Sequence, residues 1–431
     1  MMLPARSAAD NADRQFLRRV TPHLTGRHIG RSAGPAIAAT VDSAIDRAPL
    51  RQISSQMMPV GTGTKSVVVR GLTRCARPTL TSRKLSTYTV LGLIGYVVAS
   101  GAAGIAATAW GFTLGERLIG ELAPPLAFLA AMAIARAVTG RERIAFYQTA
   151  FAGVVGTALV ADIAGVRVAP IIDLATLGIG TFLVFGRIGC FAAACCHGTL
   201  GHGVVYGANH VAIGFWARWE GRALWPVQLI ESAASAALVI IAALSGTRAP
   251  GIAAVIYITG YGVARFGLEL LRGDATRPYL RGASEAQWLA LISVAACAIW
   301  HPHVLTLAAV TLLTAAMVWL LTHARYRELL QPPHLRELDD VCRRVLADPK
   351  HARRETSLGV AMSCYAMPDH RIDWVFSSTH PAWSIATARR IAVALWQVHE
   401  IVEGRAPGII HIIVPSTGVP AELLEDDPLI N

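Results

Sequence analysis

Gly186-Arg187-Ile188-Gly189-Cys190-Phe191, running on to Ala194-Cys195-Cys196-His197-Gly198, stands at the end of the long apolar run 168–185. The sequence therefore delivers an arginine, three cysteines and a histidine together at a membrane boundary. A charge at or inside the hydrocarbon edge is costly unless it is paired. A lone arginine there equally fits a side chain that snorkels to the interface. The neighbouring polar residues instead favour a site in which the guanidinium binds a lipid phosphate through two parallel hydrogen bonds.

The composition around this stretch is that of a membrane protein. Of the 431 residues, 53% are hydrophobic and only 16% are charged, which predicts a polytopic membrane protein and not a soluble enzyme. The net charge of +11 is concentrated in residues 1–85, which hold 14 Lys or Arg against 4 Asp or Glu. Beside a membrane domain, we expect this basic segment to meet anionic lipid headgroups, and we expect no nucleic-acid partner.

Residues 1–85 contain no apolar run long enough to span a bilayer. They are rich in Arg, Ala, Ser, Thr and Gly, and we expect them to be mostly disordered. The composition superficially suits an organelle transit peptide but lacks a clear amphipathic repeat, and no secretory signal is visible. An overextended gene start is the alternative, with Met57 or Met58 as the true beginning.

Apolar runs of about 16 to 22 residues begin at Tyr88, and each is long enough to cross roughly 30 Å of hydrocarbon. They predict helices over 88–109, 118–138, 146–163, 168–186, 226–244, 251–271, 285–300 and 303–322. Only His301-Pro302-His303 separates the last two, which form either a tight hairpin or one irregular span. Residues 86–322 are therefore expected to be a membrane domain of about seven or eight transmembrane helices.

The composition becomes that of a soluble protein after Thr322. Residues 323–354 predict a charged helical linker that is most periodic over 330–347. Strands are expected at 357–365, 372–376 and 409–414, with a helix over 383–398. The predicted fold class is therefore an all-α polytopic membrane protein with a small C-terminal soluble α/β or α+β domain, residues 323–431.

Few charged residues lie inside the predicted spans. Asp173 and Glu231 are among them, and Arg265 and Glu269 are spaced four apart, which puts them on one helix face and allows an ion pair. Such a pair either locks the helix bundle together or belongs to a site. Ionisable groups within a membrane more often belong to a site.

The connection 197–225 is long for a loop between membrane helices, rich in glycine, and carries three tryptophans that suit the membrane interface. Its histidines His197, His202 and His210 are candidate bases near neutral pH. The nearby cysteines lack the paired spacing of a structural zinc site, so we expect no metal here.

Three ordered blocks of sequence carry a resemblance to a known family. The first is the opening stretch around Arg187; the others are Trp225-Pro226-Val227-Gln228-Leu229-Ile230-Glu231 and Gly260-Tyr261-Gly262-Val263-Ala264-Arg265-Phe266, the last followed by Glu269 and Arg272. In this order they resemble the signature blocks of bacterial prolipoprotein diacylglyceryl transferases. Asp173 matches as well, because that family also has an Asp fourteen residues before its signature arginine. The resemblance covers about 140–300 well and leaves 1–85 and 323–431 uncovered.

The resemblance implies a multi-pass protein of the bacterial inner membrane that needs no cofactor. Enzymes of this family move a diacylglyceryl group from phosphatidylglycerol to the thiol of the lipobox cysteine in a prolipoprotein signal peptide, in lipoprotein biosynthesis. By analogy, Arg187 and Arg265 grip the phosphate of the lipid and stabilise charge on the leaving group. Further residues would bind substrate or hold the arginines in place: Tyr261, Gln228, Glu231, Glu269 and Asp173.

This sequence departs from the family pattern where a base is expected. The family's Asn after Gly-Arg-x-Gly is Cys190 here, its acidic residue in the next motif falls on Cys195, and its helix-three histidine is missing. One alternative is that His197 abstracts the proton. Another is that Cys195 or Cys196, activated by the nearby arginine, is a nucleophile that carries the lipid group. A third is that the donor or the acceptor differs from the family's.

Other classes of function make different predictions. A transporter using the buried charges as an ion path predicts inverted repeats, which the sequence does not show. A non-catalytic homologue that binds lipid would keep the signature arginines. Eight spans would place both tails on one side, which carries most of the loop arginines and would be cytoplasmic by the positive-inside rule. The family instead places its signature arginine on the outer face.

Overall fold

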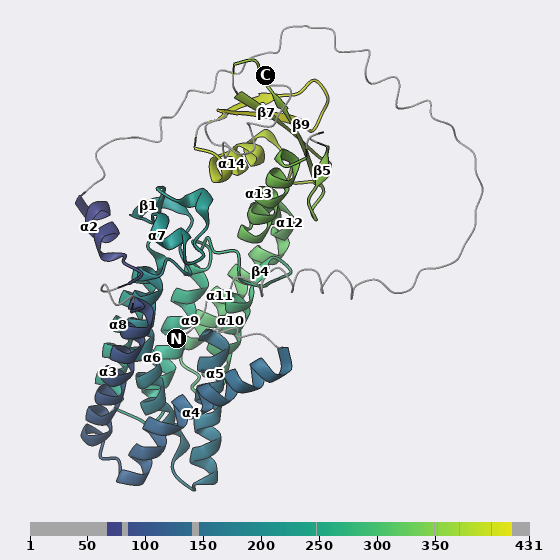
Figure 1. Ribbon diagram of the computed structural model, residues 1–431. Helices are drawn as coiled ribbons and strands as arrows, with labels where there is room; N and C mark the ends of the chain where they lie inside the picture. The colour runs from purple at the N-terminus through teal and green to yellow at the C-terminus, as the bar shows by residue number, and fades with distance from the viewer. Residues whose placement is uncertain are drawn as a thin grey trace. The chain divides into compact units, whose positions relative to one another are not determined.

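The computed structural model describes residues 67–79, 85–139, 146–246, 248–348, 350, 352–369, 371–397 and 399–415. The apolar helices expected from the sequence are all present (Figure 1). They are α3 (Thr87–Ala109), α4 (Leu114–Thr139), α5 (Phe146–Ile163), α6 (Val168–Ala192), α8 (Val227–Ser245), α9 (Ile252–Leu268), α10 (Glu285–Trp300) and α11 (Val304–Thr322). Among the described residues, five helices are long and apolar enough to cross a membrane, and three apolar helices are shorter. The chain is therefore a polytopic membrane protein.

Helix α6 is at the centre of the membrane domain, in contact with α3, α4, α5, α8 and α9. Two glycines allow this close packing. A Cβ added at Gly180 would lie 2.6 Å from the ring of Tyr257, and one added at Gly95 would lie 2.7 Å from Phe185. With little hydrophobic driving force between helices in lipid, such close backbone approach is what holds the bundle together.

The ends of two helices differ from the prediction. Helix α6 continues to Ala192 and does not end at 186, so Arg187 and Cys190 lie in its last turns. Helix α9 ends at Leu268, before the predicted 271. The region 285–322 is a hairpin: α10 and α11 pack on each other, and His303 caps α11 by accepting a hydrogen bond from the Leu305 amide. Of the two alternatives, the tight hairpin is confirmed.

Part of the basic N-terminal segment is folded. Helix α2 (Val67–Cys75) packs on strand β1 (Leu200–Val205), and the Thr73 hydroxyl accepts a hydrogen bond from the Val205 amide at 3.2 Å. At least these nine residues of the segment expected to be mostly disordered are helical. Residues 1–66 and 80–84, and with them the possible starts at Met57 and Met58, lie outside the described residues.

The connection between α6 and α8 is a compact, aromatic unit. It contains β1, α7 (Ala208–Val211), the 3-10 turn η1 (Ala217–Trp219) and β2 (Ala223–Leu224), with β1 and β2 paired antiparallel. A second short hairpin, β3 (Tyr279–Leu280) with β4 (Ala283–Ser284), joins α9 to α10. Both connections follow directly on the helix ends that carry the signature arginines.

The C-terminal part has a five-stranded antiparallel sheet in the order β5-β6-β7-β9-β8. Its elements are α12 (Ala324–Arg327), η2 (Glu328–Leu330), α13 (Pro332–Leu346), β5 (Arg354–Glu355), β6 (Val360–Ala366), β7 (Arg371–Ser378), α14 (Ile385–Leu395), β8 (Glu400–Glu403) and β9 (Ile409–Pro415). An antiparallel sheet with two helices makes this an α+β fold. Strands β5 and β8 were missed because they are only two and four residues long.

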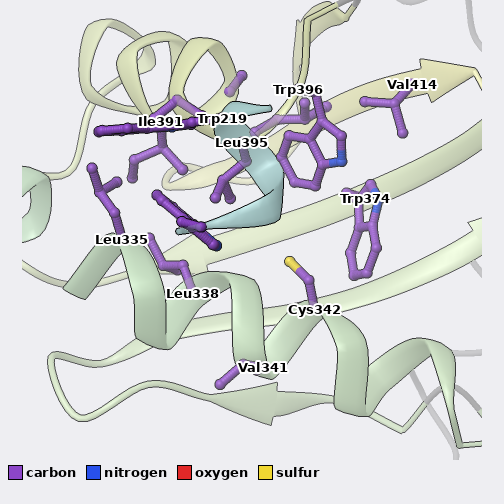
Figure 2. Close-up of a cluster of buried hydrophobic side chains, with 14 of the residues drawn as sticks. Trp219, Leu335, Leu338, Val341, Cys342, Trp374, Ile391, Leu395, Trp396 and Val414 are labelled. Atoms are coloured by element: carbon purple, nitrogen blue, oxygen red, sulfur yellow. The ribbon is translucent and has the colours of Figure 1, made fainter. Parts of the chain in front are cut away.

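One face of this sheet is covered by α13 and α14. Alternate residues of β7 and β9 point inward, among them Trp374, Phe376 and Ile412. In the same cluster lies Trp219 from the loop between α6 and α8, close to Leu395 and Trp396 (Figure 2). The C-terminal core is therefore completed by a residue that belongs to the connection following the signature stretch.

Candidate active site

The two signature arginines meet on one carboxylate. Arg187 Nη2, from the end of α6, lies 3.0 Å from Glu231 Oε1 on α8, and Arg265 Nη1 on α9 lies 3.3 Å from Glu231 Oε2. The Tyr261 hydroxyl donates to Glu231 Oε1 at 2.6 Å. All four side chains are buried. Three sequence blocks that are far apart in the chain are thereby brought together as the resemblance implied.

The ion network continues beyond the end of α9. Arg265 also pairs with Glu269, which in turn pairs with Arg272 and Arg277. Arg272 Nε lies 2.9 Å from Asp274 Oδ1. Burial alone would raise the pKa of the Glu269 carboxyl, but the three surrounding guanidinium groups outweigh burial and lower that pKa to about 2. Glu269 is therefore ionised at any physiological pH.

This network is rich in guanidinium groups. Arg187, Arg265, Arg272 and Arg277 pair with Glu231, Glu269 and Asp274. The four arginine side chains are only 5 to 9% exposed. Four guanidinium groups gathered in a buried place form a setting that suits an anionic ligand.

All four arginines line one cavity of about 620 Å³, a volume within the range of small-molecule sites. Its walls also include apolar side chains, notably Phe128, Met132, Phe182 and Leu289, and three cysteines, Cys190, Cys195 and Cys196. The cavity thus combines a cationic end with an apolar wall, which is the pattern of an amphipathic anion such as a phospholipid.

The turn that carries the cysteines is held by its neighbours. The Gln228 side-chain amide on α8 donates to the Cys195 carbonyl at 2.8 Å, and the Tyr206 hydroxyl donates to the Phe191 carbonyl at 3.1 Å. Ala194 and Cys196 have φ values of 57° and 53°, a left-handed conformation that is uncommon outside glycine. Gln228 therefore acts on the backbone of the turn in this structure.

His197 does not lie among the residues that line the arginine cavity. It is buried edge-on against the rings of Phe215 and Trp219, with centroid distances of 5.2 Å to each, and its Nδ1 lies 3.0 Å from the Gly198 carbonyl oxygen. Burial lowers its pKa and favours the neutral ring. In this structure His197 packs among aromatic rings, whereas Cys195 reaches the cavity, and a role of His197 as the base stays a prediction.

Asp173 is also placed away from the arginines. Its carboxylate accepts hydrogen bonds from the amides of Gly251, at 2.6 Å, and Ala254, at 2.8 Å, at the beginning of α9. Fourteen helical residues separate Asp173 from Arg187, or roughly 21 Å along the axis. This carboxylate caps the N-terminus of α9, where an acidic group is favoured, and the expected substrate contact of Asp173 stays a prediction.

Two members of the network, Asp274 and Arg277, were not singled out from the sequence. They lie in the short connection between α9 and β3, where Arg272-Gly273-Asp274 and Arg277 concentrate charge directly after a membrane helix. That density of charge beside the third signature block was the sequence signal that could have identified Asp274 and Arg277 as members of the network. Tyr261, Glu231 and Glu269 lie in the network but not among the residues that line the cavity, so they position the arginines.

Comparisons with known proteins point to one family. A phosphatidylglycerol–prolipoprotein diacylglyceryl transferase of Clostridium perfringens is 30% identical over 133 residues, which is 30% of this chain and 50% of the relative. The chain thus spans about half the length of this curated relative. Residues 105–301, which hold the whole arginine network, match the family model of the prolipoprotein diacylglyceryl transferases.

Proposed function

We propose that this protein transfers the diacylglyceryl group of phosphatidylglycerol to the thiol of a cysteine in a prolipoprotein signal peptide at the bacterial inner membrane. The observation that carries the proposal is the cavity lined by four buried arginines. A phosphodiester is an anion, to which the guanidinium groups of Arg187 and Arg265 can donate hydrogen bonds.

A lipid's acyl chains also find a place beside this cavity. An apolar groove of about 350 Å³ between α3, α4, α5 and α6 shares Phe128 and Phe182 with the arginine cavity. Its other walls are mostly small or apolar, including Ala99, Ala103 and Leu129. Headgroup and chains of one phospholipid would thus occupy adjoining spaces of opposite polarity.

The arginines suit the chemistry of the transfer. The acceptor sulfur forms a bond to the glyceryl carbon, the bond from that carbon to the phosphate oxygen breaks, and glycerol phosphate leaves with the electron pair. Negative charge grows on the phosphate as this bond breaks, so donors already fixed around it stabilise the transition state more than the bound lipid. The acceptor thiol must give up its proton, because the thiolate is the nucleophile.

We favour direct transfer to the acceptor thiol over a route with a covalent intermediate on Cys195. A diacylglyceryl group on Cys195 would be a thioether, and the phosphate on which the arginines act would already have left. The second transfer would then displace one thiolate with another, without help from the cationic cavity. In a single displacement, the acceptor sulfur attacks in the same step in which the arginines stabilise the leaving phosphate.

The test is transfer of labelled diacylglyceryl by the purified full-length protein from phosphatidylglycerol vesicles to a peptide with a lipobox cysteine. We expect a labelled thioether and an equal amount of glycerol phosphate, with no product from a Cys→Ser peptide. Phosphatidylcholine vesicles are the matched donor control and should give little product, because their headgroup carries no net charge. A folded protein that binds phosphatidylglycerol and forms no product would contradict the proposal.

A second candidate is a homologue with another thiol acceptor. It is favoured by one observation, namely that Cys190 and Cys195 line the cavity at positions where the family has an Asn and an acidic residue. In the same assay, release of glycerol phosphate with small thiols but not with the lipobox peptide would favour this candidate.

A further inference from the structure

The three cysteines of the signature stretch form a cluster of sulfur atoms. Cys190 lies in the last turns of α6, and Cys195 and Cys196 follow in the turn after it. Their three sulfur atoms all lie within 4.8 Å of one another, and none of the three residues is in a disulfide. No histidine or carboxylate of the described residues joins this group.

The spacing of the sulfurs suits a thiophilic metal ion. Zinc binds thiolate sulfur at about 2.3 Å, so three sulfurs around one zinc ion lie about 4 Å apart. The three sulfur atoms of the cluster, which lie within 4.8 Å of one another, are close to that spacing. The sequence spacing argues against a closed, four-ligand structural site. Three protein ligands with an open fourth position are instead the pattern of catalytic zinc sites.

The backbone around the cluster is fixed independently of any ligand. Gln228 and Tyr206 hold the carbonyls of Cys195 and Phe191, and Ala194 and Cys196 adopt left-handed conformations that direct the chain back toward the cavity. Backbone conformations of this kind cost of order 1–3 kcal/mol each and collect at functional sites. Hydrogen bonds that hold the ligand-bearing segment are the outer-shell support that metal sites require.

The surrounding charges favour a metal held by three thiolates. Such a centre has one net negative charge, because three thiolates face a divalent cation. Four guanidinium groups border the same cavity. The nearby arginines, which would repel a bare cation, therefore stabilise the complete centre.

We propose that Cys190, Cys195 and Cys196 bind one Zn²⁺ ion whose fourth position opens into the arginine cavity. Resting on the proposed function, we infer further that the acceptor thiol takes this fourth position. A zinc ion held there would lower the pKa of the acceptor thiol, whose proton would pass to water, and the thiolate would attack the glyceryl carbon beside the phosphate. The sulfur–carbon bond forms, the carbon–oxygen bond breaks, and glycerol phosphate leaves.

This inference explains why neither histidine nor carboxylate is needed as a base beside the acceptor. It also explains the three cysteines as one unit. A disulfide would use only two of them and would leave the third without a role. Zinc is the preferred ion because it is redox-inert, accepts thiolates and tolerates an open position.

The first measurement is the metal content of the full-length protein, purified in lipid nanodiscs under anaerobic reducing conditions. We expect one equivalent of zinc per chain by mass spectrometry. Replacement by Co²⁺ should give intense thiolate-to-cobalt charge-transfer bands and the visible spectrum of a tetrahedral site. Absence of a stoichiometric metal in the reduced, folded protein would overturn the proposal, as would stoichiometric copper in place of zinc.

Variants then assign the ligands. Cys190→Ser, Cys195→Ser and Cys196→Ser should each lower zinc affinity at least tenfold, in proteins whose thermal unfolding shows that they are folded. Cys75→Ser, at an exposed cysteine outside the cluster, is the matched control and should keep full zinc content. Unchanged affinity in all three cluster variants would overturn the assignment.

Transfer assays separate this inference from the proposed function. Removing zinc with a chelator should reduce transfer at least tenfold, and adding Zn²⁺ should restore it. Full transfer by the zinc-free protein would overturn the activating role and leave the proposed function standing. Bound zinc without any transfer would leave the metal site standing and contradict the proposed function.

Discussion

Two ion networks in this chain both join arginines to buried carboxylates, but their arginines differ in exposure to water. In one, Asp339 of α13 accepts from Trp216 Nε1 at 3.0 Å and pairs with Arg218 and Arg343. In the other, Glu231, Glu269 and Asp274 pair with four arginines. Arg343 is 55% exposed, so water solvates its charge, whereas the cavity arginines are at most 9% exposed. Paired arginines indicate a binding site where they line a cavity and are shielded from water.

Asp339→Ala should give the largest effect on stability. It leaves the indole of Trp216 and the guanidinium of Arg218 without their buried carboxylate, and breaking such a pair costs about 3–5 kcal/mol. We expect this loss in the free energy of unfolding, measured by thermal or denaturant unfolding in detergent. Lipid binding to a protein that remains folded should change little. A stability close to that of the wild type would show that Asp339 is not the centre of its network.

Arg187→Ala should give the largest effect on activity. It removes a donor that acts on charge growing in the transition state, which costs about 10²- to 10³-fold in rate. Glu231 keeps Arg265 and Tyr261 as partners, so the fold should survive. Arg343→Ala is the matched control from the other network and should change transfer less than about twofold. Equal losses of transfer activity in the two variants would show that the two networks do not differ in their role in transfer.

Tyr261→Phe tests a residue that acts through another. It removes a hydrogen bond to a carboxylate, and such bonds are worth about 1.5–3 kcal/mol. We expect transfer to fall roughly tenfold, because Glu231 would no longer be held in position. The change in kcat should be larger than the change in KM. Tyr257→Phe is the control, because the Tyr257 hydroxyl pairs with the neutral Ser235 hydroxyl at 2.7 Å. Similar losses of transfer in both variants would assign the effect to packing.

The smallest effect should come from the pair His411 and Asp373 on neighbouring strands. The hydrogen bond to Asp373 raises the pKa of His411 above its ordinary value near 6.5. Its stabilisation is therefore complete below about pH 6.5 and is lost as the pH rises through the raised value. Because both side chains are partly exposed, the loss should stay under about 1 kcal/mol. Asp373→Asn should flatten the dependence of Tm on pH in this range, and an unchanged dependence would exclude the pair.

The membrane helices were predictable because hydrocarbon thickness imposes long apolar runs that are read directly from the sequence. The end of α6 was not. Arg187 looked like a boundary because a charge normally ends a span, but Glu231 from another helix compensates it and the helix continues. Strand β8 was missed because two of its four residues are Glu400 and Glu403, and its pairing with β9 is set by tertiary contacts.

The grouping of the charged residues in the site was predictable from the sequence. Arg187, Arg265, Glu231 and Glu269 do meet, because so few charges in a membrane domain must find one another. The surroundings of His197 and Asp173 were not predictable, since position along the chain does not say which way a side chain points. His197 turned toward aromatic rings, and Asp173 capped a helix end. Gathering of the cysteine sulfurs also required the left-handed turn at Ala194 and Cys196.

The end of α14 bears on the order in which this protein is made. The carbonyl of Ala394 accepts hydrogen bonds from Trp219 Nε1 at 3.1 Å and from Arg222 at 2.8 Å, across 175 and 172 residues of chain. These donors are synthesised well before their acceptor, at translation rates of about 5–20 residues per second. For that interval Trp219 lacks the apolar cluster that buries it in the finished protein. The aromatic loop therefore matures only after the last helix has been made, and truncations before α14 should leave it prone to aggregation.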